Sequence, residues 1–319
     1  MQYSAAARGV RLSTMETRQV DVLILGGGVA GMTAAVYAAR AGLRVTLLEE
    51  NACGGLVNWT RVVENMPSYI SIPGMELADR MAEQVAALGV DVEEAACIEE
   101  ISLAAGDKTV VADDVRYEAR AVIAATGRRP VLLDCAGDCC QVHYCAICDG
   151  SAYKGRHVLV VGGGNSGFDE ALALLDTGVA RVTLIEAQDR FFAAAAAQRA
   201  LAAREGAVMY TSTRVTQLHG TDALESVTLT RADGSEQQLP CDGIFVFMGQ
   251  EPSTQLFRGQ LELDAQGYIV TDGLMATSVP GVFAAGDVRP KRYRQITTAL
   301  SDGTVAALEA ERYIRRTAG

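Results

Sequence analysis

The chain has 319 residues, which is enough for two domains of ordinary size, and its 49% hydrophobic and 21% charged residues are typical of a soluble globular protein. The formal net charge of −11 argues against nucleic acid or an anionic membrane as the main partner. No apolar run reaches the roughly 18–20 residues of a membrane-spanning helix, so we expect neither a nucleic-acid partner nor a membrane partner.

Residues 1–19 are interpreted as a short leader. They contain Arg8, Arg11 and Arg18 but no apolar h-region, so they do not resemble a secretory signal, and Met15 is an alternative start. We therefore expect a cytoplasmic protein.

A nucleotide-binding pattern follows directly. Val20–Leu25 is predicted to be a strand, Met32–Ala41 a helix and Arg44–Leu48 a second strand, with a glycine-rich turn at 26–31 between the first two. Glu49 ends the second strand. This strand–turn–helix–strand order with GxGxxG spacing and a terminal acid is typical of a dinucleotide site.

Each glycine of that turn has a separate physical reason. Gly26 permits the tight turn, Gly28 lets the backbone approach a pyrophosphate, and Gly31 lets the helix pack closely on the strand. The pyrophosphate then lies at the helix N-terminus, where free N–H groups favour an anion, and Glu49 can accept hydrogen bonds from a ribose.

The same pattern recurs later in the chain. His157–Val161 is predicted to be a strand, Phe168–Thr177 a helix and Arg181–Ile185 a strand ending on Glu186. The second turn supplies the candidate contacts Gly162, Gly164, Asn165, Ser166 and Gly167. Two such patterns in one chain indicate two dinucleotide sites.

Two interruptions mark crossings between domains. The strand Ala121–Ala125 ends on Thr126-Gly127-Arg128, and the strand Asp242–Met248 is followed by Gly249 and Pro252. Residues 281–287 then form a short buried strand ending in an acid, and the last helix runs from about Ile296 to Ile314.

This order predicts an α/β fold of two Rossmann-like (three-layer ββα) dinucleotide-binding domains, the second inserted into the first. The first domain comprises residues 20–127 and 251–319 and is discontinuous. The second comprises residues 128–250 and carries the Cys-x-x-Cys pair discussed next.

Eight cysteines are present, and Cys145 and Cys148 form the one Cys-x-x-Cys pair followed by an acid. In a reducing cytosol such a pair is catalytic or metal-binding. Isolated Cys53, Cys97 and Cys241 are interpreted as small buried hydrophobes. Cys135, Cys139 and Cys140 do not have the spacing of metal ligands and are interpreted as incidental thiols of a surface loop, with nearby His143 structural or exposed. We expect no metal.

Four segments together resemble the low-molecular-weight thioredoxin reductase family, over the chain from about residue 20 onward. They are GGGVAGMTAAVYAARAGL at 26–43, VENMPSYISIPGMEL at 63–77, CAICDG at 145–150 and GVFAAGDVRPKRYRQ at 281–295. The resemblance implies a homodimer with FAD in the first domain and a nicotinamide dinucleotide in the second. It also implies that the second domain rotates to present either the nicotinamide or the Cys pair to the flavin.

The family's FAD site maps onto Gly26, Gly28, Gly31, Glu49, Asn65, Asp287, Arg294 and Gln295. Asp287 would hold the ribityl–phosphate region, and Arg294 and Gln295 would face the flavin ring. One flavin contact differs, because this chain has Leu56 where the family usually has Gln after the Gly-Gly pair.

By the same resemblance, Cys148 lies next to the flavin and takes its electrons, whereas Cys145 attacks the disulfide of a thioredoxin or thioredoxin-like protein. Asp149 would be the acid–base group that protonates the departing thiolate. The structural alternative for Asp149 is a helix N-cap after the second cysteine.

The second dinucleotide site departs from the family pattern. NADPH-using members have a His-Arg-Arg run and a further Arg, which hold the 2′-phosphate. The arginine positions are here Ala187, Gln188 and Phe192, and Glu186 brings a negative charge to that place. Arg190 remains but is shifted. An acid at this strand end suits a free ribose 2′-OH, so we favour NADH over NADPH as the reductant.

Three alternatives stay open. Ferredoxin could reduce the flavin without a nicotinamide, or a small dithiol could pass electrons through the flavin to oxygen. The chain could also be a redox sensor without turnover. CAICDG at 145–150 resembles the version that reduces protein disulfides, which argues against the dithiol oxidase. The intact Cys-x-x-Cys-Asp argues against a sensor, because a sensor has no need of a flavin-linked Cys pair with an adjacent acid.

Overall fold

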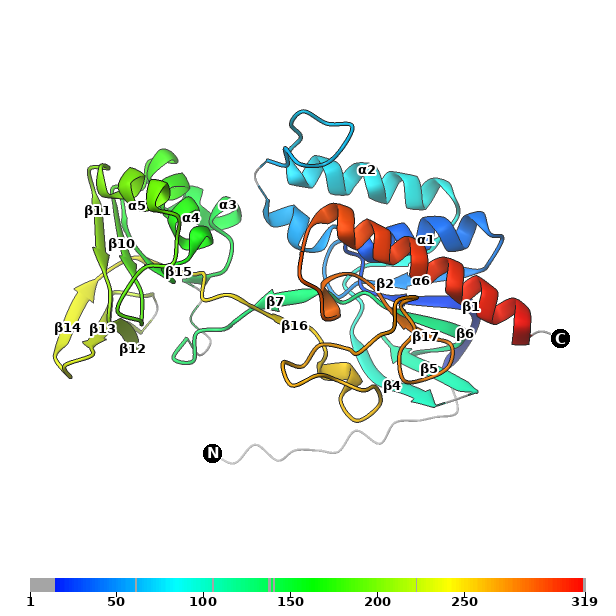
Figure 1. The fold of residues 1–319 in the computed structure, drawn as a ribbon. Helices are drawn as coiled ribbons and strands as arrows, with labels where there is room; N and C mark the ends of the chain where they lie inside the picture. The colour runs from blue at the N-terminus through cyan, green and yellow to red at the C-terminus, as the bar shows by residue number, and fades with distance from the viewer. Residues whose placement is uncertain are drawn as a thin grey trace, which may run out of the picture. The chain divides into compact units, whose positions relative to one another are not determined.

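The computed structural model describes residues 15–60, 62–104, 106–136, 139, 141–221 and 223–317. The chain divides into two compact units, one made of Met1–Arg128 and Pro252–Gly319 and the other of Arg129–Glu251. Each unit is a layered α/β structure, so the predicted α/β class is confirmed (Figure 1). No helix of the described segments is both long and apolar enough to cross a lipid bilayer.

The first unit is built on a seven-stranded sheet. Its strands are β1 (Glu16–Leu25), β2 (Val45–Leu48), β3 (Asp91–Glu93), β4 (Ile98–Ala104), β5 (Asp107–Ala112), β6 (Val115–Ala124) and β17 (Val282–Ala284). β1 pairs in parallel with both β2 and β6, whereas β4, β5 and β6 form an antiparallel meander. β17, from the second segment of the unit, pairs in parallel with the end of β6.

This sheet is buried on both faces. In β1, Val22 and Ile24 belong to one apolar cluster, whereas Leu23 and Leu25 belong to another. The alternation follows from the two-residue period of a strand, and it explains why β1 is a continuous apolar run in the sequence.

Helices α1 (Val29–Arg40), α2 (Gly74–Ala87) and α6 (Ile296–Thr317) lie together on one face of the sheet (Figure 1). Small residues let α1 and α6 approach closely. A Cβ on Gly303 of α6 would lie 2.2 Å from the Ala30 carbonyl oxygen of α1, so glycine is required there.

The predicted end of the leader at residue 19 is wrong. β1 begins at Glu16, and Glu16–Gln19 pair with residues 115–118 of β6. The side chains of this stretch are mostly exposed, so it lacks the alternation of apolar and polar residues that marks a strand in the sequence. For this reason the hydrophobic pattern predicted that the first strand begins at Val20. Residues 1–14 lie outside the described part of the chain.

The second unit has three layers. A parallel sheet is formed by β8 (Val142–His143), β9 (His157–Val161), β10 (Arg181–Ile185), β11 (Ala207–Tyr210) and β15 (Gly243–Val246). Helices α4 (Asn165–Asp176) and α5 (Ala195–Ala202) cover one face. The antiparallel strands β12 (Thr213–His219), β13 (Ser226–Arg231) and β14 (Glu236–Pro240) cover the other.

The two crossings between the units are paired with each other. β7 (Arg128–Pro130) and β16 (Gln250–Pro252) form a two-stranded sheet, and the Arg129 guanidinium lies 2.7 Å from the Glu251 carboxylate. The remaining short elements are η1 (Gly55–Trp59), α3 (Ala146–Asp149), η2 (Gly150–Tyr153), η3 (Gln255–Phe257) and η4 (Gly286–Val288).

The core of the second unit gives a stability prediction. Phe168 of α4 is fully buried, and its ring makes an edge contact with Phe191 at 5.2 Å. Phe168→Ala should lower the free energy of unfolding by about 3–5 kcal/mol, because it removes a large buried ring and leaves a cavity. Phe192→Ala, at a 49% exposed ring of the same unit, should cost about 0.5 kcal/mol or less. Urea unfolding followed by circular dichroism would compare them, and equal losses would contradict this picture of the core.

Candidate functional site

The first glycine turn is shaped by three glycines with different surroundings. Gly26 has φ +107°, and a Cβ there would lie 2.5 Å from the Ala125 carbonyl oxygen. A Cβ on Gly31 would lie 1.9 Å from the Gly26 carbonyl oxygen. A Cβ on Gly28, at the start of α1, would meet nothing within 4 Å. Gly26 and Gly31 are therefore required by the protein itself, and Gly28 leaves open space at the helix N-terminus.

The second turn repeats this geometry. Gly162 has φ +121°, and a Cβ there would lie 2.2 Å from the Phe247 carbonyl oxygen; a Cβ on Gly167 would lie 1.9 Å from the Gly162 carbonyl oxygen. Gly164 precedes α4 and again meets nothing within 4 Å. Both turns thus leave room for a ligand at the position nearest the N–H groups of the helix.

The two acids that end the second strands are held in the same way. The Glu49 carboxylate accepts hydrogen bonds from the backbone N–H groups of Gly27 at 2.6 Å and Asn51 at 2.9 Å. The Glu186 carboxylate accepts them from Gly163 at 2.8 Å and Gln188 at 2.9 Å. Glu186 is therefore fixed beside its glycine turn as an acceptor, in the position that Glu49 has beside the first turn.

The loop after β10 brings little positive charge to this site. Ala187 and Gln188 are exposed and uncharged, and the exposed Arg190 lies over the Phe192 ring at 5.3 Å. Ser166 is exposed at the start of α4, and the Asn165 side chain accepts a hydrogen bond from the Ala194 N–H at 2.8 Å, which ties the loop to the turn.

Two predicted flavin contacts that are far apart in the sequence lie side by side in the first unit. The Asn65 amide donates to the Gln295 side chain at 3.0 Å, although 230 residues separate them. Arg294 lies over the Tyr268 ring at 4.7 Å and donates from one guanidinium nitrogen to the Lys291 carbonyl oxygen. Leu56 of η1 is half-buried and presents an apolar side chain where the family has an amide.

Two of the predicted flavin contacts, Asp287 and Arg294, each have a buried polar atom without a hydrogen bond in the described structure. These atoms are one carboxylate oxygen of Asp287 and the Nε of Arg294. Burial raises the pKa of the Asp287 carboxyl, and the ammonium of Lys291 at 3.7 Å opposes that shift. Orphaned buried polar atoms are costly, so this arrangement fits a ligand that brings hydroxyl groups and anionic oxygens, as FAD would.

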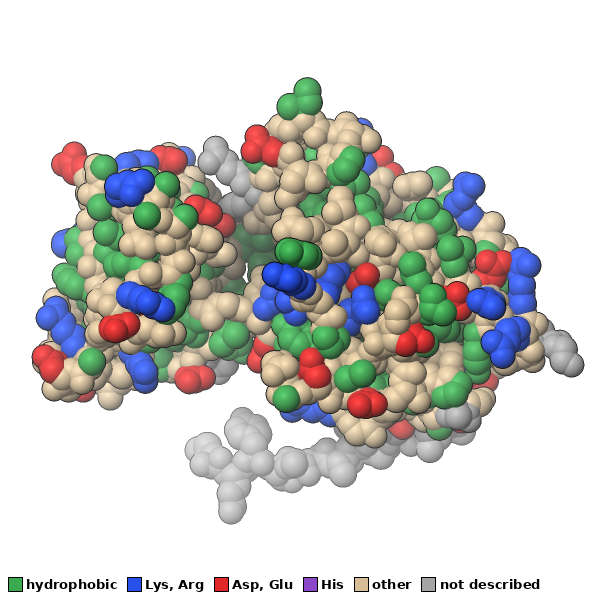
Figure 2. Space-filling view, viewed as in Figure 1, with side chains coloured by type: hydrophobic (Ala, Val, Ile, Leu, Met, Phe, Trp, Pro, Cys, Tyr) green, Lys and Arg blue, Asp and Glu red, His purple; other side chains and the backbone are tan. Residues whose placement is uncertain are grey.

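Sequence reasoning missed the group that supports Asp287. Asp302 of α6 is buried and accepts from the Gly286 N–H at 3.1 Å and from Lys291 at 2.9 Å. Arg289 donates to its other oxygen at 3.3 Å. Figure 2 shows Lys and Arg side chains gathered over the segment that precedes α6. The four cations within residues 289–294 were a signal in the sequence, but their partner Asp302 was not.

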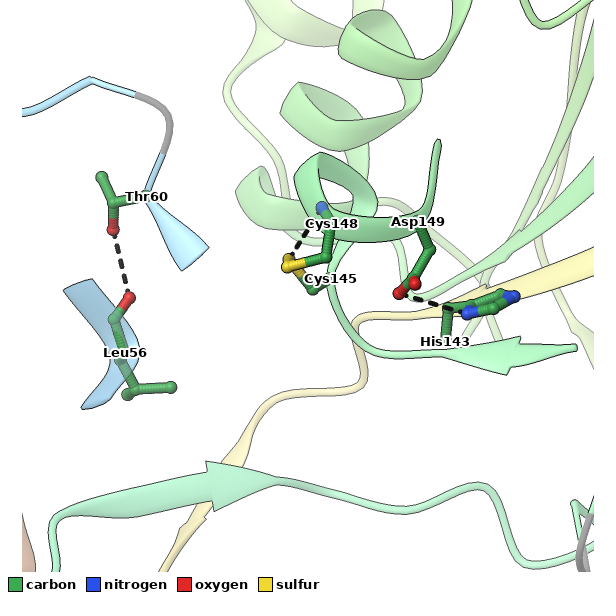
Figure 3. The surroundings of a disulfide bond; sticks show 6 residues. All are labelled: Leu56, Thr60, His143, Cys145, Cys148 and Asp149. Atoms are coloured by element: carbon green, nitrogen blue, oxygen red, sulfur yellow. Dashed lines mark hydrogen bonds and ion pairs between the residues drawn. A yellow bond between two sulfur atoms is a disulfide. The ribbon is translucent and has the colours of Figure 1, made fainter. Parts of the chain in front are cut away.

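Cys145 and Cys148 are joined by a disulfide, with their Cα atoms 5.4 Å apart (Figure 3). Cys145 is the residue before α3, and its sulfur accepts a hydrogen bond from the Cys148 N–H at 3.1 Å. The Cys145 side chain is buried, and Cys148 is exposed. After reduction, the same N–H would stabilise a thiolate on Cys145.

Asp149 does not act as a helix cap. It lies where α3 passes into η2, but its side chain makes no cap hydrogen bond. Instead its carboxylate lies 3.2 Å from Nδ1 of His143 (Figure 3). The interpretation of His143 as a structural or exposed residue was therefore incomplete, because its ring lies directly against the acid of the Cys pair.

The other cysteines differ in exposure. Cys241 is buried and Cys53 half-buried, and burial raises the pKa of each thiol to about 12. Cys97 is exposed, so its interpretation as a buried hydrophobe is wrong. Cys135 and Cys139 lie in the loop between β7 and β8, as expected, but they are half-buried and pack against the apolar cluster that contains Cys241, so they are not surface thiols. Cys140 lies outside the described residues.

Comparison with known proteins shows similarity along almost the whole chain. The model of the pyridine nucleotide-disulphide oxidoreductase family matches residues 20–303. The "34.2 kDa protein in rubredoxin operon" of Clostridium pasteurianum is 40% identical over 305 residues, covering 94% of this chain and 98% of that protein. The thioredoxin reductase of Mycolicibacterium smegmatis is 39% identical over 311 residues, covering 95% and 99%. The crystal structure of Lactococcus lactis thioredoxin reductase in the FR conformation superposes with a TM-score of 0.83 at 35% identity, covering 93% and 99%.

The paired glycines of the second turn offer a matched test. Gly164→Ala, at the N-cap of α4, should lower the free energy of unfolding by less than about 1 kcal/mol, but should weaken nicotinamide-dinucleotide binding by about tenfold or more, since its methyl group enters the space beside the helix N–H groups. Gly167→Ala should instead lower the free energy of unfolding by about 1–3 kcal/mol, because its methyl group meets backbone. Calorimetric titration and thermal melts of both variants would check this. Equal effects of the two substitutions on binding and stability would contradict the separate roles.

Proposed function

We propose that this protein reduces the disulfide of thioredoxin or a thioredoxin-like protein. The chain belongs to the low-molecular-weight thioredoxin reductase family of pyridine nucleotide-disulphide oxidoreductases. Electrons would pass from NADH through FAD and the Cys145–Cys148 disulfide. The observation that carries the proposal is the disulfide itself, formed across two residues at the start of α3 and followed directly by an acid. The working form would be a homodimer, as the resemblance implies.

The first unit would hold FAD. The candidate contacts are Gly26, Gly28, Gly31, Glu49, Asn65, Asp287, Arg294 and Gln295. The open space at Gly28 and the orphaned atoms of Asp287 and Arg294 support this assignment. Bound FAD would supply the two-electron reduction of the Cys145–Cys148 disulfide, with NADH as the source of the electrons.

The second unit would bind NADH in preference to NADPH. The candidate contacts are Gly162, Gly164, Asn165, Ser166, Gly167 and Glu186. The Glu186 carboxylate accepts hydrogen bonds from two backbone N–H groups beside the turn, which hold its negative charge at the site. A carboxylate there accepts hydrogen bonds from ribose hydroxyls and repels a 2′-phosphate. Arg190, the one nearby cation of the 186–192 loop, is engaged with Phe192.

The thiol steps follow from the positions of the two cysteines. The Cys145 thiolate attacks one sulfur of the substrate disulfide, so a mixed disulfide forms and the other substrate sulfur leaves as a thiolate. Asp149 gives that thiolate its proton. The Cys148 thiolate then attacks the Cys145 sulfur, which restores the internal disulfide and releases the second substrate thiol. Because Cys145 is buried, its attack requires a movement that exposes it.

The electron donor is tested by anaerobic mixing of the oxidised protein with NADH or with NADPH. We expect rapid loss of the flavin absorbance with NADH and much slower loss with NADPH. Glu186→Gln should reduce the ratio of the rate with NADH to the rate with NADPH by about tenfold, since it removes the negative charge and keeps a hydrogen-bond acceptor. Faster reduction by NADPH would refute the assignment of Glu186. No reduction by either nucleotide would direct the search to ferredoxin or a small dithiol as donor.

Serine variants test the order of the two cysteines. Cys145→Ser should abolish turnover with thioredoxin while the protein keeps FAD, because the attacking sulfur is lost. Cys148→Ser should accumulate a mixed disulfide between Cys145 and thioredoxin, which mass spectrometry would detect. The control is Cys97→Ser, at an exposed cysteine of the first unit, which should turn over normally. A Cys145→Ser variant with normal turnover would rule out the proposed order.

A further inference from the structure

We propose that His143 is a positioning residue for Asp149, which holds the carboxylate in place and shares its proton. The acid–base group of the Cys pair would then be the imidazole–carboxylate pair and not the carboxylate alone. This inference rests on the proposed function, because it assigns a second member to the group that protonates the departing thiol.

The His143 ring is held on three sides. His143 lies in β8, paired in register with Phe245 of β15, and its ring stacks on the Phe245 ring at 5.1 Å with an interplanar angle of 28°. Its Nδ1 lies 3.2 Å from the Asp149 carboxylate. Its Nε2 lies 2.6 Å from the Tyr153 hydroxyl. Both ring nitrogens therefore have a polar partner, and only 15% of the side chain is exposed.

Tyr153 is itself fixed by the sheet. Its ring is buried and makes an edge contact with Phe245 at 5.5 Å. A Cβ on Gly243 of β15 would lie 2.4 Å from the Tyr153 ring, so the glycine leaves the room that this ring fills. The row from Tyr153 through His143 to Asp149 is thus built from η2, β8 and the end of α3, on a platform supplied by β15.

This row accommodates two protonation states without moving a heavy atom. With Asp149 ionised, Nδ1–H of a neutral His143 donates to the carboxylate, and the Tyr153 O–H donates to Nε2. When one proton is added, Nε2 also becomes protonated, and the proton in the Asp149–Nδ1 hydrogen bond can then lie on either partner. Nε2–H then donates to the Tyr153 oxygen, whose own proton turns away. Rotation of one hydroxyl is sufficient, so the proton can be held and released at low reorganisation cost.

The consequence for the reaction depends on the leaving thiol. Attack by Cys145 forms one S–S bond and breaks another, and the departing sulfur carries away the electron pair. An alkyl thiolate is a poor leaving group and needs the proton that the Asp149–His143 pair supplies. An aromatic thiolate of an acidic thiol leaves without one. The inference therefore predicts an effect that depends on the substrate and that a purely structural role of His143 would not produce.

The test uses the full-length protein, reduced with dithiothreitol under anaerobic conditions and desalted. It is mixed with bis(2-hydroxyethyl) disulfide or with 5,5′-dithiobis(2-nitrobenzoate). His143→Ala should slow reaction with the alkyl disulfide about tenfold, within the range that general acid catalysis contributes, and alter reaction with the aromatic disulfide by about twofold or less. His143→Asn, whose amide can orient the carboxylate but cannot hold a proton, should recover less than half of the loss.

Two further variants serve as a second test and a control. Tyr153→Phe keeps the ring packing, removes the hydroxyl beside Nε2 and should slow only the alkyl disulfide, by less than His143→Ala. His219→Asn alters another half-buried histidine of the same unit, which is bonded to Thr228 at 2.7 Å, and should change neither rate.

Equal slowing of both disulfides by His143→Ala, or full recovery in His143→Asn, would overturn the sharing of a proton. Failure of the proposed function has a different signature. In that case reduced wild-type protein would react with both probes no faster than Cys145→Ser.

Discussion

Both units depend on one close approach of backbone to backbone. In each glycine turn, the carbonyl oxygen of the first glycine lies 1.9 Å from where a Cβ on the last glycine would be. Only this contact lets the helix start directly over the end of its strand. The N–H groups of the first helical turn then point into open space, and the acid at the end of the next strand accepts a hydrogen bond from the N–H of the second residue of the turn, Gly27 or Gly163. The chain contains this construction twice, so one physical solution provides two sites for anionic cofactors.

The two copies have been adapted differently around the same frame. The first adds a charged cluster in which Asp302, Lys291 and Arg289 surround the start of η4 and leave an oxygen of Asp287 without a hydrogen bond. The second has an acid, Glu186, beside its turn in the same position as Glu49 in the first, and a following loop with little positive charge. It also carries the Cys pair, which needs a nearby proton donor more than it needs further charge. The sheet of the second unit holds the proposed donor, because the pairing of β8 with β15 places the His143 ring against Asp149.

The sequence by itself determined the parts whose signal is local. The strands at His157–Val161 and Arg181–Ile185 have the predicted bounds, because apolar runs ended by glycine or an acid are short-range patterns. The glycine spacing and Cys145-x-x-Cys148 are likewise local, since two residues between cysteines already bring their sulfurs together. The helices α1 and α4 begin three residues before the predicted starts, because the carbonyl oxygens of Gly28 and Gly164 already accept helical hydrogen bonds from the N–H groups of Met32 and Phe168.

Only the tertiary structure decided which distant or differently oriented side chains meet. Asn65 bonds to Gln295 through the return of the chain into the first unit. Asp302 bonds to Lys291 because α6 folds back over the segment that precedes it. His143 is six residues from Asp149, yet their contact depends on the pairing of β8 with β15, about a hundred residues further along the chain. Cys97 is exposed and Cys241 buried, although both are isolated cysteines in the sequence. Residue type and spacing determine what a side chain can do, whereas its orientation and burial depend on packing against segments that no local pattern identifies.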